Sequence, residues 1–457
     1  MWQNQNMLKE AVAHYHELLK DFDLAESSRL ALDEGLEDAK LIFGGRRVSP
    51  YLRPHFVLES DWRRVVSICE TVWSALQKVK DAAIGNDQML NELGITDIEK
   101  DLVAIDPKYA QVSPTARLDS FLTENSYSFV ELNGESPAGI AYADSATEIF
   151  KSLPIMQKFS EKYDVQGFEG SSKLLDVLVR AYEEFLGRKP EKNPVIAIVD
   201  LKDLPTQQEF ELFQNYFQNN GYTAFICSPD ELEFDGKNLL YKEAVVDIVY
   251  KRLLVNEYLP IIESAPALLN AYQTGAVCLV NNFRSKIVHK KAIFAVLTNE
   301  RYAHLFNEAE QEAIQAHIPW TRKFREEKTV NKNETIELVE WTRANKAKLV
   351  LKPNDDYGGH GIYIGWASID EEWEKAIKVA LENGDYLVQE RVQTSKEMFP
   401  MLDAVGNWQM IEQLVDLDPL LFNGVVGSAF TRLSSSELAN VSSGGGMVPT
   451  FIIREKD

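Results

Sequence analysis

Residues 352–361 read Lys352-Pro-Asn-Asp-Asp-Tyr-Gly-Gly-His-Gly361, a lysine followed by a glycine-rich loop. Apolar runs flank this stretch, at 349–351 before it and at 362–364 after it. Two short apolar runs around a glycine loop predict two strands joined by that loop. The arrangement differs from a Walker loop, in which GxxxxGK[ST] opens a helix. The N–H groups of such a loop and a lysine ammonium are suited to binding phosphate oxygens.

A second polar cluster lies far upstream, at Arg117-Leu-Asp119 and Glu131-Leu-Asn133. The alternation over 127–133 predicts a strand that places Glu131 and Asn133 on one face, because residues two apart in a strand point the same way. The distance from Asp119 to this strand suits a neighbouring antiparallel strand after a turn. Carboxylate and amide oxygens are the hard ligands that Mg²⁺ prefers.

Together the two clusters predict a site for ATP and magnesium. Each cluster alone also has a plainer interpretation. A lysine before a glycine loop occurs in solvated hairpins, because Gly and Asp form turns readily. A Glu-x-Asn pair on a strand occurs on exposed sheet faces. Their conjunction in one chain favours a nucleotide-dependent enzyme.

Composition places the chain among globular proteins of more than one structural unit. It has 457 residues, of which 45% are hydrophobic and 26% charged. The formal net charge is −22, from 70 acidic and 48 basic residues, and no basic run appears. Such a field repels polyanions, so nucleic acid is not an expected partner, and an ATP site must gather its own cations.

The cysteines and the apolar runs indicate a cytoplasmic protein. Cys69, Cys227 and Cys278 are odd in number, lack CxxC spacing and lie in apolar segments, which predicts reduced, buried thiols. The first residues contain no apolar signal region, and no apolar run approaches the roughly 20 residues of a membrane span. The sequence therefore predicts no membrane partner, and it gives no indication of oligomeric state.

The patterns predict an α/β (α+β) fold with four ranges. Residues 1–114 are mainly helical, with one apolar stripe recurring at three- and four-residue steps between Trp62 and Val79. The range 115–189 carries the metal-binding strands. Over 190–282, strands expected at 194–200, 222–227 and 245–250 alternate with a helix expected at 207–219, as in a small parallel α/β unit. The range 283–457 carries the nucleotide-binding region, in which the patterns predict the start of a helix at 286–297 and a strand at 408–414.

The two clusters resemble those of the ATP-grasp enzymes. Their order, with the carboxylates before the glycine loop, resembles the circularly permuted branch that includes glutathionylspermidine synthase-like ligases. The shared phrase is Arg-x-Asp followed by a strand that ends Glu-x-Asn and a turn of small residues and proline, here Gly134-Glu-Ser-Pro137. The resemblance implies a permuted ATP-grasp fold, in which 190–282 is the pre-ATP-grasp-like unit on the substrate side.

The resemblance also implies a role for each matching residue. Asp119, Glu131 and Asn133 would bind magnesium, in two ions, and Arg117 would steady the transferring phosphoryl group. The other implied contacts are Lys291 and Lys352 on the phosphates, Gly358, Gly359 and Gly361 in a covering loop, Gln389, Glu390 and Val392 at the adenine edge, and Arg432 with residues 444–446 near phosphate and substrate. Lys290 stands where the family has asparagine, so either Lys290 or Lys291 could reach phosphate.

These features predict an ADP-forming ligase that joins a small-molecule carboxylate to an amine through an acyl-phosphate. His360 stands in the glycine loop where glutathionylspermidine enzymes have arginine and glutamate, so their substrate does not carry over. The basic pairs Arg46-Arg47 and Lys251-Arg252 hint at an anionic substrate, although Arg46-Arg47 reads equally well as a surface loop. Two alternatives stay open, namely a non-catalytic ATP-binding scaffold or sensor and another ATP-driven phosphoryl transfer enzyme.

Overall fold

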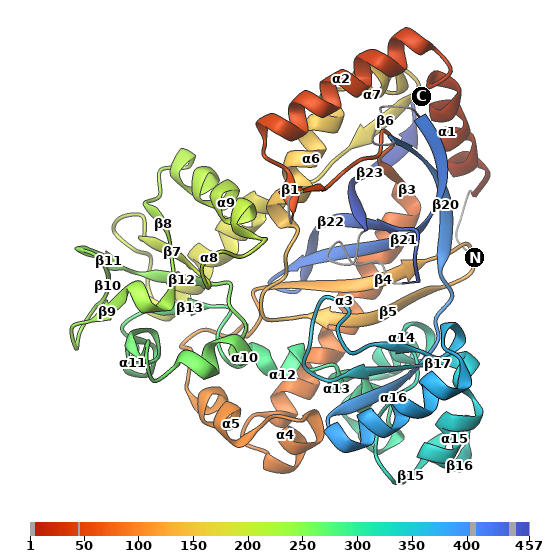
Figure 1. Cartoon of the computed structure of the whole chain (residues 1–457). Helices are drawn as coiled ribbons and strands as arrows, with labels where there is room; N and C mark the ends of the chain where they lie inside the picture. The colour runs from red at the N-terminus through yellow and green to blue at the C-terminus, as the bar shows by residue number, and fades with distance from the viewer. Residues whose placement is uncertain (1–4, 44–45, 403–407, 438–444, 457) are drawn as a thin grey trace.

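The computed structural model describes residues 5–43, 46–402, 408–437 and 445–456. They form a mixed α/β fold of three lobes (Figure 1). One lobe is built on an eight-stranded sheet, one on a four-stranded parallel sheet, and one on a four-stranded antiparallel sheet. Within these residues, no helix has the length and apolar character that crossing a membrane requires.

The large sheet joins strands from both ends of the chain. Its order is β3-β23-β22-β21-β4-β5, while β20 pairs with β21 and β6 with β23. In Figure 1 the orange pair β4 and β5 lies beside the blue strands β21 and β22. The strands are β3 (His55–Leu58), β4 (Thr115–Leu122), β5 (Tyr127–Asn133), β6 (Tyr163–Gln166), β20 (Ser395–Leu402), β21 (Trp408–Phe422), β22 (Val425–Ser434) and β23 (Gly446–Glu455).

One face of the large sheet packs on the long helix α3 (Glu59–Ala83). The apolar stripe expected between Trp62 and Val79 lies on this helix, and Val65, Cys69, Val72 and Leu76 are buried in its core cluster. Around the sheet lie α1 (Gln5–Leu18), α2 (Phe22–Asp38), α6 (Ile140–Ser152) and α7 (Pro154–Phe159), and below α3 lie α4 (Asp87–Leu93) and α5 (Asp97–Ala104).

The expected parallel α/β unit is present. Its strands run in the order β13-β12-β7-β8, all in parallel pairs. The structure corrects one expectation here, because the apolar run at 245–250 is divided between the hairpin strand β11 and the sheet strand β12. The elements are β7 (Ile196–Val199), β8 (Ala224–Cys227), β9 (Leu232–Phe234), β10 (Leu239–Tyr241), β11 (Ala244–Val246), β12 (Ile248–Lys251), β13 (Cys278–Val280), α8 (Gly170–Leu186), α9 (Gln207–Asn219), α10 (Val255–Tyr258) and α11 (Ala267–Thr274).

The third lobe contains the glycine loop, which joins two antiparallel strands as expected. Its sheet has the order β14-β19-β17-β18. The elements are β14 (Thr321–Lys323), β15 (Lys328–Asn331), β16 (Glu334–Glu337), β17 (Leu349–Pro353), β18 (Tyr363–Ile364), β19 (Tyr386–Glu390), α12 (Ser285–His289), α13 (Ala292–Leu297), α14 (Glu308–His317), α15 (Leu338–Ala344) and α16 (Asp370–Asn383). The hairpin of β1 (Ile42–Phe43) and β2 (Arg46–Arg47) lies apart, in the N-terminal range.

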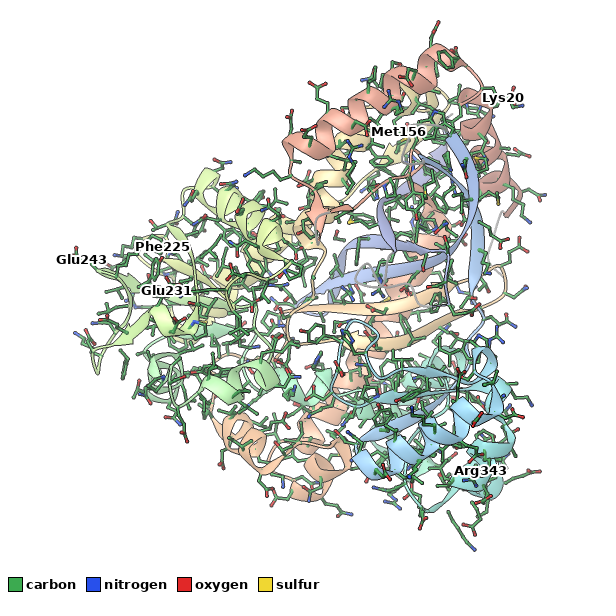
Figure 2. The ribbon with its side chains drawn as sticks, in the orientation of Figure 1. Lys20, Met156, Phe225, Glu231, Glu243 and Arg343 are labelled. Atoms are coloured by element: carbon green, nitrogen blue, oxygen red, sulfur yellow. The ribbon has the colours of Figure 1, made fainter. Side chains whose placement is uncertain are left out.

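Surface and interior differ in charge as a globular fold requires. Figure 2 shows Lys20, Glu243 and Arg343 projecting outward at the edges of the molecule, whereas Met156 lies among the helices of the upper lobe and is 1% exposed. All three cysteines are buried and unpaired, in agreement with the prediction of reduced thiols.

Candidate functional site

The predicted metal-binding strands are adjacent and antiparallel. Asp119 on β4 pairs in register with Glu131 on β5, and Arg117 pairs with Asn133. The Asn133 Nδ2 donates to Asp119 Oδ1 at 3.0 Å and to Glu131 Oε1 at 3.4 Å. The hairpin therefore places the two carboxylates and the amide on one face, as their spacing predicted.

Two arginines converge on the Asp119 carboxylate. Arg117 donates from Nε to Oδ1 at 2.7 Å and from Nη2 to Oδ2 at 3.0 Å, and its Nη1 donates to the Ala138 carbonyl. Arg432 on β22 donates from Nη2 to Asp119 Oδ2 at 2.6 Å. Burial alone would raise the pKa of Asp119, but the two guanidinium groups outweigh it and lower that pKa. Asp119 is therefore held ionised in a buried position.

Two further aspartates belong to this cluster and were not predicted. Arg432 Nη2 lies 2.6 Å from Asp416 Oδ2, and its Nε lies 2.8 Å from Asp418 Oδ2. Burial raises the pKa of Asp416 to about 6 and raises that of Asp418 well above its usual value. Their alternation on β21 was the available signal, because Asp416 and Asp418 are two residues apart and share a face.

The donor set fits a magnesium ion, with one rearrangement. Three aspartate carboxylates and two guanidinium groups share the buried cluster, so carboxylate oxygens of the kind that a divalent cation binds are gathered there. Asp119 and Glu131 offer carboxylate oxygens. Asn133 turns its amide nitrogen toward them, so its side-chain amide must rotate by about half a turn to offer oxygen.

Two lysines flank the Glu131 carboxylate. Lys352 Nζ donates to the Val130 carbonyl at 2.7 Å, across 222 positions of sequence. Lys291 Nζ lies 3.5 Å from Glu131 Oε2 and donates to the Asp356 carbonyl at 2.5 Å. Burial lowers the pKa of Lys352 to about 8; Glu131 opposes this shift, and Lys291 adds to it. The phosphate-binding lysines of the prediction thus lie beside the metal-binding strand.

The neighbouring Lys290 points elsewhere. Its Nζ lies 2.8 Å from Asp355 Oδ2 and 3.1 Å from Glu99 Oε1, and the residue is 2% exposed. The run 286–297 was expected as the start of one helix, but α12 ends at His289 and α13 begins at Ala292. The break lets successive lysines project in different directions. Of the two, Lys291 lines the cavity described below.

The glycine loop covers this cluster. Gly358, Gly359 and Gly361 have φ values of 69°, 83° and 68°, a region that favours glycine. A Cβ on Gly361 would lie 2.8 Å from the Tyr386 hydroxyl, so the loop also needs a small residue there. The Tyr357 hydroxyl donates to Glu257 Oε1 at 3.0 Å and so links the loop to α10 of the parallel unit.

The segment 389–392, which the resemblance places at the adenine edge and which we call the hinge, lies at the end of β19. Gln389 is buried, and its Nε2 donates to Thr321 Oγ1 at 3.0 Å. Its side chain therefore links β19 to the neighbouring strand β14. Next to it, the Arg391 guanidinium stacks over the Trp366 ring at 4.2 Å. Neither Arg391 nor Trp366 was singled out from the sequence, because nothing local to Trp366 shows that it faces the hinge.

One cavity of about 140 Å³ unites these groups. Most predicted site residues line it, and the exceptions Arg117, Asn133 and Gly361 lie just behind its wall. Gly446 begins β23 and does not line the cavity, and residue 444 lies outside the described residues. The predicted residues that line the cavity are Asp119, Glu131, Lys291, Lys352, Gly358, Gly359, Gln389, Glu390, Val392 and Arg432.

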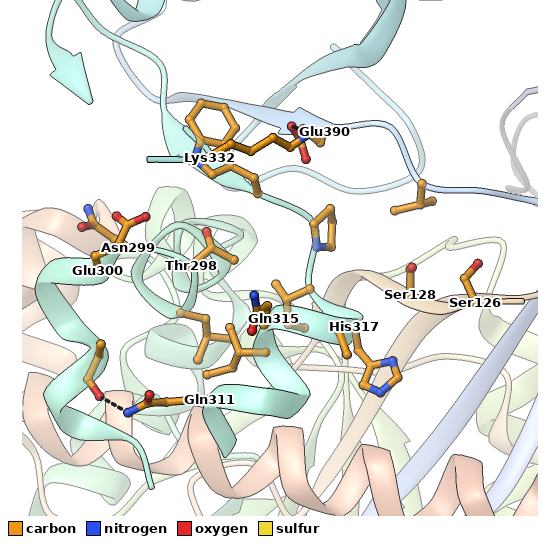
Figure 3. Close-up of a pocket in the computed structure, with 18 of the residues that line it drawn as sticks. Ser126, Ser128, Thr298, Asn299, Glu300, Gln311, Gln315, His317, Lys332 and Glu390 are labelled. Atoms are coloured by element: carbon orange, nitrogen blue, oxygen red, sulfur yellow. Dashed lines mark hydrogen bonds and ion pairs between the residues drawn. The ribbon is translucent and has the colours of Figure 1, made fainter. Parts of the chain in front are cut away.

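A larger cavity, of about 620 Å³, adjoins the same hinge. Figure 3 shows it between α14, which carries Gln315 and His317, and two segments opposite, the turn after β15 with Lys332 and strand β19 with Glu390. Lys332 Nζ lies 3.8 Å from Glu390 Oε1, so its charge is balanced by that carboxylate. The charged side chains of this cavity balance, with Glu300 and Glu390 against Lys332 and Arg391, so a polyphosphate is better matched by the lysine-lined cavity.

Other charged groups singled out from the sequence serve the fold. Lys251 and Arg252 are buried, and they donate to the carbonyls of Leu253 and Pro137 respectively. Arg47 pairs with Asp33 on α2. These contacts engage Lys251, Arg252 and Arg47 within the fold without a substrate, and the side chain of Arg46 lies outside the described residues.

One further group of metal-ligating side chains gathers in the described part of the chain, at Glu135, His289 and Asp355. Lys286 Nζ already lies 2.7 Å from Asp355 Oδ1 and 3.0 Å from Glu135 Oε1. The buried ammonium therefore supplies the positive charge that a metal ion would bring.

The comparisons bear on the fold. No protein-family model matches the chain, and no curated protein has a significantly similar sequence. A glutathione synthetase-like effector from Globodera pallida, solved in its apo form, superposes with a TM-score of 0.61 at 13% identity, over 93% of this chain and 96% of that one. This chain shares the effector's fold.

Two other solved structures are more distant. A putative gamma-glutamylcysteine synthetase from Methylobacillus flagellatus KT gives a TM-score of 0.40 at 8% identity, over 82% of this chain and 83% of that one. A D-cycloserine synthetase gives 0.26 at 14% identity, over 54% of this chain and 92% of that one. TM-scores below 0.5 do not establish a shared fold. The fold assignment therefore rests on the superposition with the effector.

Proposed function

We propose that the protein is an ATP-dependent carboxylate–amine ligase of the permuted ATP-grasp type. The observation that carries the proposal is the single cavity in which Asp119 and Glu131 meet Lys291, Lys352 and the glycine loop. These groups come from distant parts of the chain, and their chemistry matches a metal-bound polyphosphate. The fold shared with a glutathione synthetase-like effector supports the same reading.

Each group has a role in this proposal. The ammonium groups of Lys291 and Lys352 and the N–H groups of the glycine loop would bind phosphate oxygens. The backbone of 389–392 would face the adenine edge. Asp119, Glu131 and the rotated Asn133 would hold magnesium, which when bound neutralises charge on the phosphates. Arg432 would face the reacting groups, while Arg117 would act by holding Asp119 in place, since its nitrogens already have acceptors.

The protein's main task in this reaction is to align the substrate carboxylate with the γ-phosphate of ATP, and no protein nucleophile is needed. A substrate carboxylate oxygen attacks the γ-phosphorus of ATP, the bond from that phosphorus to the bridging oxygen breaks, and ADP leaves. The amine nitrogen then attacks the acyl carbon, the carbon–oxygen bond to phosphate breaks, and the nitrogen gives a proton to solvent. The products are an amide, ADP and phosphate.

The cavity as it stands is smaller than the roughly 300–1,000 Å³ of typical ligand pockets. The loop over residues 354–362 would therefore move outward to admit a nucleotide. Tyr357 is 50% exposed, and its single hydroxyl contact with Glu257 is a weak restraint on that movement.

Nucleotide affinity should fall at alkaline pH. Lys352 has its pKa lowered to about 8 by burial, so its ammonium is present below that pH and is lost above it. Binding of Mg-ATP, measured by isothermal titration, should be nearly constant between pH 6.5 and 7.5 and about tenfold weaker at pH 9. The variant Lys352→Arg, whose guanidinium stays charged, should lose this dependence. An equal decline in that variant would assign the effect to another group.

The two neighbouring lysines should behave differently. Lys291→Met removes a cation from the cavity and should weaken Mg-ATP binding by about tenfold or more, with little effect on stability. Lys290→Met removes a buried cation that pairs with both Asp355 and Glu99. It should lower the free energy of unfolding by about 3 kcal/mol. Titration and urea denaturation of both variants test this contrast. The reverse pattern would place phosphate beside Lys290.

Turnover is tested by incubating the protein with Mg-ATP and mixtures of amino acids, other carboxylic acids and amines. The proposal expects ADP release that requires both an acid and an amine, with a new amide found by mass spectrometry. Nucleotide binding without turnover would favour a sensor or scaffold. A phosphorylated product without an amide would favour a phosphoryl transfer enzyme.

A further inference from the structure

We propose that a second cavity, between α1, β3, β20 and the turn after β4, binds a small monocarboxylic acid with an apolar body. Its volume is about 460 Å³, within the range of ordinary ligand pockets. It is lined by Arg53, His16 and Glu397 together with several apolar side chains. The inference does not depend on the proposed ligase activity.

The polar end of the cavity is an arginine whose hydrogen-bonding capacity is only partly used. Arg53 is 0% exposed, and its guanidinium stacks over the Phe399 ring at 3.9 Å. Its Nη2 donates to Glu397 Oε2 at 2.8 Å and to the Met398 carbonyl at 3.3 Å. Its Nε and Nη1 have no acceptor among the residues that the structure describes. Buried donors of this kind are normally satisfied, so the cavity is expected to supply an acceptor.

A second donor or acceptor lies on α1. The Nε2 atom of His16 is buried and has no partner within the described part of the chain. Burial lowers the pKa of His16 to about 4, so its ring is neutral at pH 7. The neutral ring can donate from Nε2 or accept there, according to its tautomer. His16 and Arg53 together offer hydrogen bonds to one small polar group.

The charges around the cavity favour a single negative charge on that group. Glu397 is paired with Arg53, and Lys9 pairs with Glu124 at 2.5 Å. The remaining carboxylate of the wall, Asp61, lies in the first turn of α3, where the positive end of the helix dipole offsets its charge. The other lysine of the wall, Lys396, lies 3.7 Å from Glu412. A cationic ligand would compete with Arg53 for Glu397, and a phosphate would bring more charge than one guanidinium can match. A carboxylate, with one charge and two acceptor oxygens, fits the free donors.

The rest of the wall defines the body of the ligand. It is apolar and comes from α1, β3 and the end of β4, and its side chains are Leu8, Val12, Ala13, Phe56, Val57, Leu58 and Leu122. A hydrocarbon or aromatic chain of a few carbons would therefore be removed from water when the carboxylate meets Arg53.

This cavity is separate from the nucleotide cavity. Phe121 lines the nucleotide cavity and Leu122 lines this one, and successive residues of a strand point to opposite faces. The same division occurs on β22, where Arg432 faces the nucleotide cavity and Thr431 contacts His55 of this one through its hydroxyl at 3.0 Å. The two ligands would bind on opposite faces of the large sheet.

The test uses 4-phenylbutanoate with two size-matched probes, 4-phenylbutan-1-ol and 4-phenylbutylamine, titrated calorimetrically into the full chain. The acid should bind with a dissociation constant of about 1 mM or tighter, and the alcohol and the amine at least about tenfold more weakly. Val12→Trp fills the cavity and leaves Arg53 in place. The double variant Arg53→Met with Glu397→Gln removes the charged pair without an unpaired buried carboxylate. Val12→Trp and the double variant should each weaken binding of the acid at least about tenfold. Circular dichroism checks that both variants are folded.

Lys352→Met serves as the control for the nucleotide cavity and should leave binding of the acid unchanged. Equal affinity for the acid and the alcohol, or no loss of affinity in Val12→Trp, would overturn the proposal. So would a loss of affinity in Lys352→Met, which would place the acid in the nucleotide cavity. Failure of ligase activity alone would leave these results as they are, so the two proposals fail independently.

Discussion

Replacing Lys352 by methionine should lower the rate of ATP turnover about a hundredfold, equivalent to about 3 kcal/mol of transition-state stabilisation. The Lys352 ammonium is one of the two lysine ammonium groups that line the cavity beside Glu131, and the residue is 5% exposed. In such a buried setting its charge is weakly screened by solvent and acts strongly on phosphate oxygens. Methionine keeps the apolar stem, so the loss should come from the charge.

The measurement is ADP release at saturating acid and amine, together with Mg-ATP affinity. Lys348→Met is a matched control, because Lys348 precedes the same strand but is exposed to solvent. It should turn over ATP at the wild-type rate. Comparable losses in both variants would show that general positive charge, and not this cavity, governs the reaction.

Replacing Arg432 by methionine should destabilise the protein by about 3–5 kcal/mol, because it leaves buried carboxylates without a partner. Arg432 lies 2.6 Å from oxygens of both Asp119 and Asp416 and 2.8 Å from one of Asp418. Urea denaturation at pH 7 measures the change. Arg454→Met removes a half-exposed pair with Asp164 and should cost at most about 1 kcal/mol.

The loss caused by Arg432→Met should depend on pH. Without the guanidinium, the folded-state pKa values of Asp416 and Asp418, which already lie above their unfolded values, rise further, so the folded variant binds more protons than the unfolded chain. Its stability therefore falls as pH rises through those pKa values. The deficit relative to wild type should be smaller at pH 5 than at pH 8. A deficit that is equal at both values would indicate lost packing and not unpaired charge.

Local periodicity predicted much of the fold. The strand over 127–133 and the helix over 207–219 were expected from spacing alone, and β5 and α9 have those bounds. Both patterns are complete within a few residues of sequence, which is why they can be read without the structure. The strand expected at 408–414 continues to Phe422, because its second half pairs with β4, a partner remote in sequence.

Remote pairings limited the prediction of the site. Asp119 and Glu131 were placed together by a short hairpin, whereas their proximity to Lys352 was inferred from a resemblance and not from spacing. Asp416 and Asp418 were missed because their role depends on the pairing of β21 with β22. The break between α12 and α13, which separates Lys290 from Lys291, has no marked signal in the sequence. That the assembled residues bind nucleotide stays a prediction.

The most direct test is a crystal structure with magnesium and a non-hydrolysable ATP analogue. The account predicts a metal ion about 2.1 Å from carboxylate oxygens of Asp119 and Glu131, with phosphate oxygens within hydrogen-bonding distance of the Lys291 and Lys352 ammonium groups. A nucleotide bound instead in the larger cavity beside His317, with no metal between β4 and β5, would contradict it.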